Sequence, residues 1–435
     1  MNTNKNWVLC TGGLHICFAD LHSLGTSIDG SGIDTITVDT GIYSAAALRG
    51  IFGGKQYKRG IEFHIICYLS ITMLMYDAIL SSHDTRNVTT QSEEFRDSLH
   101  KRDVATADDI FEDIQGWYHE HIKTDADSSN YSEFAQFLVE YTKQVENLLE
   151  FQSNCRSGKF EAYLDELEAM IKFFFARDQL NYARLMPIYL GQMRELKTKD
   201  PETWKALKEG DFVVTQSKVP FTAMYTDQAL EHKIKELKRH GGMVGLLQDE
   251  TSLDRLVTIA PQLTKLVKDF LEGFPQAQRS TSGIDHHQLS GNMAVRIIQH
   301  ATKIKDSIVK HNGGNPFLVP SPLKTLTSAT LVPDSAKEDI LKYAEKGQAR
   351  FEEFVESRLL PSSVVSVWDP MKKLKLKTFK NFMPKTVIRL GDKVMKLRED
   401  RELLGRCLII QSCRPELVPQ LDETIGHYEM GVVPR

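Results

Sequence analysis

The chain has 435 residues, of which 41% are hydrophobic and 26% are charged, and its formal net charge is −4 at pH 7. This length allows two or three domains with sizeable cores, and the composition is that of a globular rather than a disordered protein. So small a net charge excludes a strong field over the whole chain of the kind that marks a nucleic-acid binder.

Six scattered cysteines form no CxxC pair, so no zinc ribbon or thioredoxin-like motif is predicted. Few cysteines in a long chain are typical of reduced thiols. The first residues show no basic-then-apolar signal peptide. We therefore expect an intracellular protein, with nucleus and cytosol both open.

Residues 1–80 are glycine-rich and mixed in character. The short apolar pattern of residues 7–10 predicts a strand, and the weak alternation of residues 33–39 is typical of a second strand or of a loop. Residues 61–80 form the strongest apolar run, interrupted by Glu62, His64 and Asp77. A membrane-spanning helix needs ~20 apolar residues, so a buried core helix is the better interpretation and no membrane partner is expected. We expect an α/β remnant plus one buried helix.

Residues 81–176 are predicted to form an acidic helical insertion. Residues 93–168 carry nineteen acidic and seven basic side chains. Within this segment, residues 134–149 and 160–175 repeat apolar side chains at helical spacing. Residues 182–196 repeat the pattern, although Pro187 is expected to kink or restart that helix.

Three further segments follow. Residues 177–273 are predicted to be helical, with a helix from Thr226 or Asp227 to about residue 240. Residues 274–333 combine a linker with a helix over 291–311 that ends at Gly313. Residues 334–435 are a helical and basic region, with a capping-box pattern at Ser335 and Glu338 and a further helix near 391–405.

The strongest basic stretch is residues 371–398, with ten basic side chains and one acidic. Apolar residues interleave with lysines there, which suits phosphate contacts on an anchored segment. The plainest interpretation of such a charge run is a solvated face. Two alternatives stay open: the lysines snorkel around a small core, or the basic stretch docks on acidic parts of the fold. The candidate nucleic-acid-binding residues are Lys372, Lys373, Lys375, Lys377 and Lys380.

Common catalytic motifs are absent from the sequence. A Walker phosphate loop fails at Arg49 and Gln56, and neither GxSxG nor HExxH occurs. Asp227 and Glu231 lie four residues apart, so a helix places both carboxylates on one face, where they can bind a divalent cation if other acids approach. Alternatively, Asp227 favours the first helical turn and Glu231 pairs with Lys235.

Several short sequence segments resemble those of a large group of uncharacterised animal proteins derived from transposable elements. The resemblance covers most of the chain in the same order. Its main phrases are residues 12–15, 54–59, 177–184, 223–231, 314–317 and 427–431.

The resemblance implies a layout similar to transposases with a ribonuclease-H-like core. Glu231 matches the last acid of such a core, Asp227 lies beside it, and His15 or Asp20 stands where a second acid belongs. The chemistry would be metal-dependent phosphodiester transfer, with Mg²⁺ required only in that case. The chain has few candidate strands, and relatives continue beyond its end, so we expect a partial copy with an incomplete catalytic core.

These observations predict a mainly α (α+β) fold, with helical bundle segments and a small, incomplete ribonuclease-H-like α/β part. The expected function is that of a transposable-element-derived protein without intact catalysis and without a resident cofactor or metal. The alternative is a non-enzymatic helical module that binds protein or nucleic acid, with DNA as the expected partner of the basic stretch.

Overall fold

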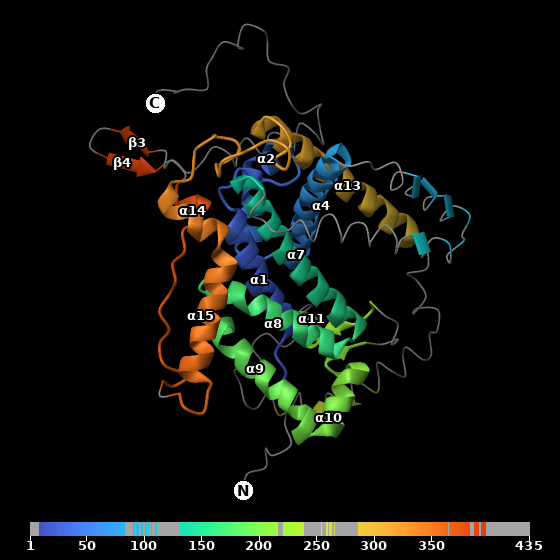
Figure 1. Ribbon diagram of the computed structural model, residues 1–435. Coiled ribbons are helices and arrows are strands. Elements are labelled where there is room, and N and C mark those ends of the chain that lie inside the picture. Colours follow the sequence, from blue (N-terminus) through green and yellow to red (C-terminus); the bar gives the residue numbers. More distant parts are fainter. Residues whose placement is uncertain are drawn as a thin grey trace.

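The computed structural model describes residues 8–82, 131–215, 221–238, 286–363, 365–382, 387–390 and 393–396, together with isolated positions in 90–110 and 254–265. These residues are mainly helical, as predicted (Figure 1). Their strands form two separate antiparallel hairpins, β1–β2 and β3–β4. The elements are α1 Gly13–Ile28, α2 Ile33–Asp39, α3 Ala45–Phe52, α4 Tyr57–Ser82, α7 Glu133–Ser157, α8 Phe160–Ala176, α9 Leu180–Lys199, α10 Pro201–Ala206, the π-helical turn η3 Leu207–Asp211, β1 Val213–Val214, β2 Met224–Tyr225, α11 Thr226–Lys238, α13 His286–Asn312, α14 Asp334–Leu341, α15 Tyr343–Arg358, the 3₁₀ turn η6 Phe379–Asn381, β3 Val387–Leu390 and β4 Lys393–Lys396.

Helix α8 is the centre of the bundle. Its apolar side chains form a broad face, and only Glu161, Asp165 and Glu168 are exposed on the opposite side, so other elements must cover most of its circumference. It packs against α7, α9, α15 and α1. Its buried residues are Phe160, Tyr163, Leu164, Leu167, Met170, Ile171, Phe173, Phe174, Phe175 and Ala176. The predicted helical pattern over 160–175 is therefore confirmed.

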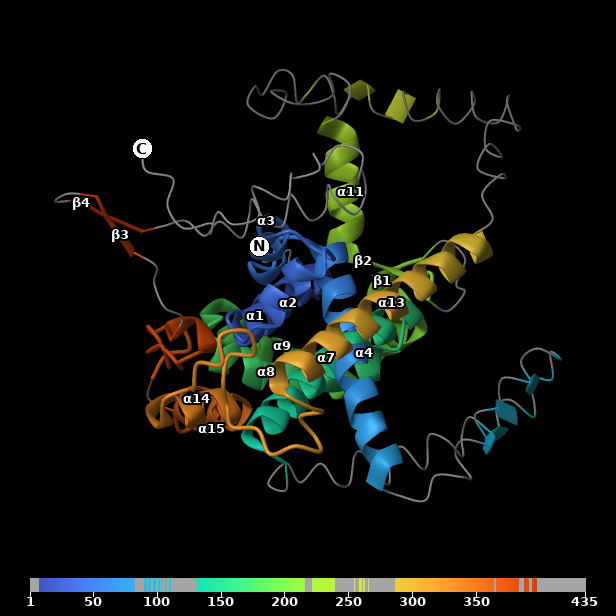
Figure 2. The same cartoon turned by 90° about the horizontal axis from the view of Figure 1, so that it is seen from above.

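Helix α4 is the buried helix predicted over 61–80. Its 22 residues Tyr57–Ala78 have a mean hydropathy of 1.2, which by length and composition alone would suffice to cross a membrane. Every residue from 61 to 78 is buried or half-buried. The helix packs against α13, α7, α1 and α3 (Figure 2). This packing is that of a core helix.

The strands predicted in residues 1–80 are wrong. Residues 33–39 form helix α2, and residues 8–10 have no regular secondary structure. Helix α2 starts after Gly32, which has a left-handed φ of 97°, and the Thr37 hydroxyl donates to the Ile33 carbonyl at 2.7 Å. Its β-branched residues favour strands only weakly, and packing against α3 and α13 outweighs that preference.

Two further boundaries differ from prediction. Pro187 lies inside α9, which continues through it, and the single helix expected after Ser335 is divided into α14 and α15 at Lys342. Within the helix expected near 391–405, residues 393–396 form β4, which pairs with β3, while 397–405 lie outside the described residues.

One hydrophobic cluster contains residues from Leu14 to Phe379. Members come from each of the predicted segments 1–80, 81–176, 177–273, 274–333 and 334–435. The described parts of these segments therefore share one core.

Helices α8 and α15 touch backbone to backbone. A Cβ atom at Gly347 of α15 would lie 2.0 Å from the carbonyl oxygen of Lys172 and 2.9 Å from the Cβ of Ala176. Only glycine permits this approach, which brings Tyr343 and Ala344 into a second cluster with Phe173 and Ala176.

We expect Gly347→Ala to lower the free energy of unfolding by about 1–3 kcal/mol, because the helices must separate to admit the methyl group. Gly191→Ala is the matched control, since nothing lies within 4 Å of a Cβ at Gly191 of α9. Removing an exposed helical glycine should stabilise the protein by about 0.5–1 kcal/mol. Urea denaturation measures both, and equal effects of the two substitutions would contradict the close contact.

Candidate functional site

The Asp227 carboxylate caps α1, the first helix in the described part of the chain, from 213 residues away. The amide of Leu14 donates to its Oδ1 at 3.1 Å, and the amide of His15 donates to its Oδ2 at 3.0 Å. Gly12 precedes α1 and offers no side chain of its own as a cap. Because the first amides of a helix lack internal acceptors and attract negative charge, Asp227 supplies what α1 lacks.

Gly12 and Gly13 make this approach possible. A Cβ at Gly12 would lie 2.3 Å from Oδ2 of Asp227, and a Cβ at Gly13 would lie 2.5 Å from the Tyr225 ring. The sequence segments 12–15 and 223–231 therefore pack tightly against each other, in a contact that we call the interlock. Both were singled out in the sequence, but nothing in their spacing predicted that they meet.

His15 is the residue that this interlock brings to Asp227. Its Nδ1 lies 2.8 Å from Oδ2 of Asp227, and the two side chains are 53% and 15% exposed. The contact fixes the orientation of the His15 ring, since it adds to the bond that Asp227 accepts from the His15 backbone. A histidine oriented by a carboxylate is common in catalytic sites, but it needs further groups to perform chemistry.

Below the interlock lies a chain of hydrogen bonds between helices. The Gln152 amide donates to the Tyr57 hydroxyl at 2.7 Å, and the Tyr57 hydroxyl donates to that of Tyr225 at 3.3 Å. The Tyr225 hydroxyl lies 3.3 Å from Sγ of Cys17. These bonds attach β2 to α1, α4 and α7, so Asp227 is held firmly beside the start of α1.

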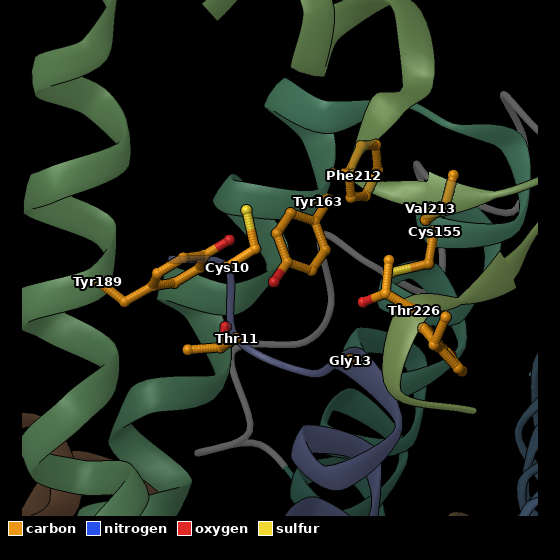
Figure 3. Close-up of a pocket in the computed structure, with 10 residues that line it drawn as sticks. Cys10, Thr11, Gly13, Cys155, Tyr163, Tyr189, Phe212, Val213 and Thr226 are labelled. Atoms are coloured by element: carbon orange, nitrogen blue, oxygen red, sulfur yellow. The ribbon is translucent and has the colours of Figure 1, made fainter. Parts of the chain in front are cut away.

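A small pocket adjoins this chain (Figure 3). Its volume of ≈ 10 Å³ is about the smallest that can admit one water molecule. Tyr163 and Tyr189 reach towards Cys10 and Thr11 at one end, and Cys155 lies at the other (Figure 3). Cys10 is exposed, but partial desolvation raises the pKa of its thiol, and burial raises the pKa of Cys155 well above its ordinary value. Both thiols therefore stay protonated near neutral pH, which makes them poor nucleophiles.

The structure places Glu231 one helical turn beyond Asp227 on α11, half-buried. In the described part of the chain, no group of three or more His, Cys, Asp or Glu side chains is arranged to hold a metal ion. The carboxylate oxygens of Asp227 already accept hydrogen bonds from the amides of Leu14, His15 and Gln228. A pair of metal ions needs more carboxylate oxygens than this surface offers.

Asp20 lies on α1 but not beside Asp227. Six residues separate it from Leu14, so it lies ~9 Å further along the helix axis, too far to share a metal ion with the cap. Its side chain is fully buried, and its Oδ1 accepts a 2.9 Å bond from the Gln144 amide. Gln144 in turn accepts from the Tyr343 hydroxyl at 3.0 Å, so Asp20 belongs to a polar network inside the helix bundle.

The basic residues form a second candidate site, which we call the lysine strap: residues 371–380. It has no regular secondary structure until η6 and runs alongside α15 towards α14 (Figure 1). Both carboxylate oxygens of Asp178 accept strap amides, from Leu374 at 2.7 Å and Lys375 at 3.0 Å. Asp339 accepts the Lys377 amide at 3.1 Å.

Apolar side chains fix the strap to the core. Phe379 is 1% exposed, and its ring meets that of Phe137 edge-on at 4.9 Å. Met371 and Leu376 are half-buried and pack against the two apolar clusters. The strap is thus an ordered segment held by carboxylates beneath its backbone and by apolar side chains along it.

The five candidate lysines divide into two groups. Lys377 Nζ lies 3.3 Å from the Ser335 carbonyl and hydroxyl, and Lys380 pairs with Asp29 at 2.7 Å. Lys372, Lys373 and Lys375 are exposed, and none of them forms an ion pair with another described residue. The sequence could not separate these groups, because the anchoring acceptors are distant along the chain.

A family model described as a domain of unknown function (DUF8702) matches residues 2–421. Neither a curated protein nor a solved structure matches the chain.

Asp20 should make stability depend on pH. Burial raises its pKa to about 7, partly opposed by the Gln144 hydrogen bond. Between about pH 4 and pH 7 the folded chain keeps a proton that the unfolded chain has lost, so the Asp20 contribution to stability falls as pH rises. Between about pH 5 and pH 8, the free energy of unfolding of the natural protein should fall by up to about 3 kcal/mol more than that of Asp20→Asn.

Urea denaturation at several pH values measures this difference. The comparison cancels the titration of groups common to both proteins, such as His64, whose pKa burial lowers to about 3. Parallel pH profiles for the natural protein and the variant would show that Asp20 is ionised in the fold.

Proposed function

Because this chain belongs to the DUF8702 family of unknown function, we propose a function from its own surface: a non-enzymatic helical module that binds nucleic acid through the lysine strap. One observation carries the proposal. Lys372, Lys373 and Lys375 point away from a backbone that Asp178 and the apolar anchors hold in place.

Pre-organisation supports this role over that of a merely solvated charge run. Ordering a flexible segment on binding costs conformational entropy, and this strap is ordered before any ligand arrives. Lysines bind phosphate as point charges, and contacts to the phosphate backbone supply most of the affinity in binding without sequence preference. The fold therefore offers three cations on an ordered backbone to an anionic polymer.

The two alternatives have less support. Asp178 and Asp339 accept hydrogen bonds from backbone amides of the strap. Docking of the strap on these acids therefore does not neutralise the side-chain charges of Lys372, Lys373 and Lys375. Snorkelling describes Lys377, which lies against Ser335, better than Lys372 or Lys373.

Ribonuclease-H-like phosphodiester transfer is the weaker candidate. It rests on Asp227 and Glu231 sharing one helix and on the sequence resemblance. Against it, the β1–β2 hairpin beside α11 has two residues per strand. The cap on α1 is a sufficient structural reason for an acid at position 227. We retain transposable-element ancestry and an intracellular location as proposals on the sequence alone.

Charge reversal of the strap should weaken binding to nucleic acid strongly. The triple variant Lys372→Glu, Lys373→Glu, Lys375→Glu should bind duplex and single-stranded oligonucleotides at least about tenfold more weakly at physiological ionic strength. For the natural protein, log K should fall with log salt with a slope of about −2 to −3, as three phosphate contacts require. Fluorescence anisotropy with labelled oligonucleotides measures both quantities.

The matched control is Lys197→Glu, Lys199→Glu, Lys205→Glu, which changes the net charge equally on exposed lysines of α9 and α10. This control should keep the salt slope of the natural protein. If both triple variants lose affinity equally, net charge rather than the strap governs binding. If the natural protein does not bind at low salt, the proposed function is wrong.

A further inference from the structure

An exposed aromatic ring stands at the entrance to the lysine strap. Trp368 is 68% exposed, the second largest exposure among the large apolar side chains described. Its neighbours Val367 and Met371 are half-buried against the main core. The indole is therefore not the loose end of a disordered loop but a side chain that the fold directs outward.

The turn that carries Trp368 is heavily bonded. The Arg358 guanidinium donates to the carbonyls of Ser366 and Asp369, both at 2.8 Å, and to that of Pro370 at 3.2 Å. The Ser366 amide donates to the Asp369 carboxylate at 3.1 Å. These bonds fix the backbone on both sides of the indole, so the ring presents a pre-formed surface.

A second arginine lies beside the ring. The Arg184 guanidinium carbon lies 6.0 Å from the centre of the Trp368 ring, at the limit of a cation–π contact. Arg184 also donates to the Asp369 carbonyl at 3.2 Å. Positive charge therefore borders the indole from α9, and more follows along the chain, where Lys372 comes four residues after Trp368, at most ~14 Å of extended chain away.

We propose that Trp368 stacks on an unpaired base while Lys372, Lys373 and Lys375 contact the adjoining phosphates, so that the preferred ligand is single-stranded nucleic acid. This inference rests on the proposed function and adds the ligand class to it. In a duplex the base faces are covered by neighbouring pairs, so an exposed indole has nothing to stack on. In a single strand every base offers its face, which makes aromatic stacking tolerant of sequence.

The test compares labelled oligothymidylate, oligouridylate and a duplex of the same length, each with the full chain at low salt. Trp368→Ala should weaken binding to the single strands about 5- to 150-fold, the equivalent of ~1–3 kcal/mol for one stacked base. Trp368→Phe should keep most of the affinity. Duplex binding and every salt slope should stay unchanged, since the indole contacts no phosphate. The two single strands distinguish DNA from RNA as the ligand source.

Leu360→Ala is the matched control, because Leu360 is 46% exposed close to the same turn and has no aromatic face. It should bind like the natural protein. Single strands should also quench the tryptophan fluorescence of the natural protein more than that of Trp368→Phe, which reports the stacking directly.

The outcomes separate the two proposals. Salt-dependent binding that is equal for duplex and single strands, and unaffected by Trp368→Ala, would leave the lysine strap as the site and overturn the stacking role. Failure of every oligonucleotide to bind at low salt would overturn both.

Discussion

Burial of the broad apolar face of α8 is the constraint from which the rest of the arrangement follows. A helix whose apolar side chains cover most of its circumference is stable only when other elements enclose that surface. Here α7, α9, α15 and α1 do so, and the contact with α15 is close enough to require glycine at position 347. The turn after α8 then brings Asp178 to the strap backbone, so the packing of α8 also places the lysines.

Helical periodicity was sufficient to predict α7 and α8, because each has an apolar pattern longer than a few turns, whereas α4 was predicted from its long apolar run and the start of α11 from a capping residue. It failed for α2, where a seven-residue segment with β-branched side chains takes its conformation from its neighbours. A short segment has too few positions for a period to be recognised, and tertiary packing then decides its conformation.

The candidate sites show a different limit of sequence analysis. The basic stretch was visible as composition, but which lysines face solvent depends on Ser335 and Asp29, which lie far along the chain. Asp227 was recognised as an acid at a helix start, whereas its bonds to Leu14 and His15 were not foreseeable. Contacts between segments more than two hundred residues apart leave no trace in local spacing. The paired glycines before α1 were the one signal, since a close approach of another segment is a common reason for glycine.

The cap on α1 also has a consequence for the order in which the protein can form during synthesis. The start of α1 leaves the ribosome 213 residues before the carboxylate that completes it. At about 5–20 residues per second, that interval lasts about 10–40 s. Throughout this time the nascent helix has open amides at its start and lacks the hairpin that fastens it. Such a delay exposes apolar side chains of α1 to other nascent segments, so the early chain depends on its surroundings until its middle third emerges.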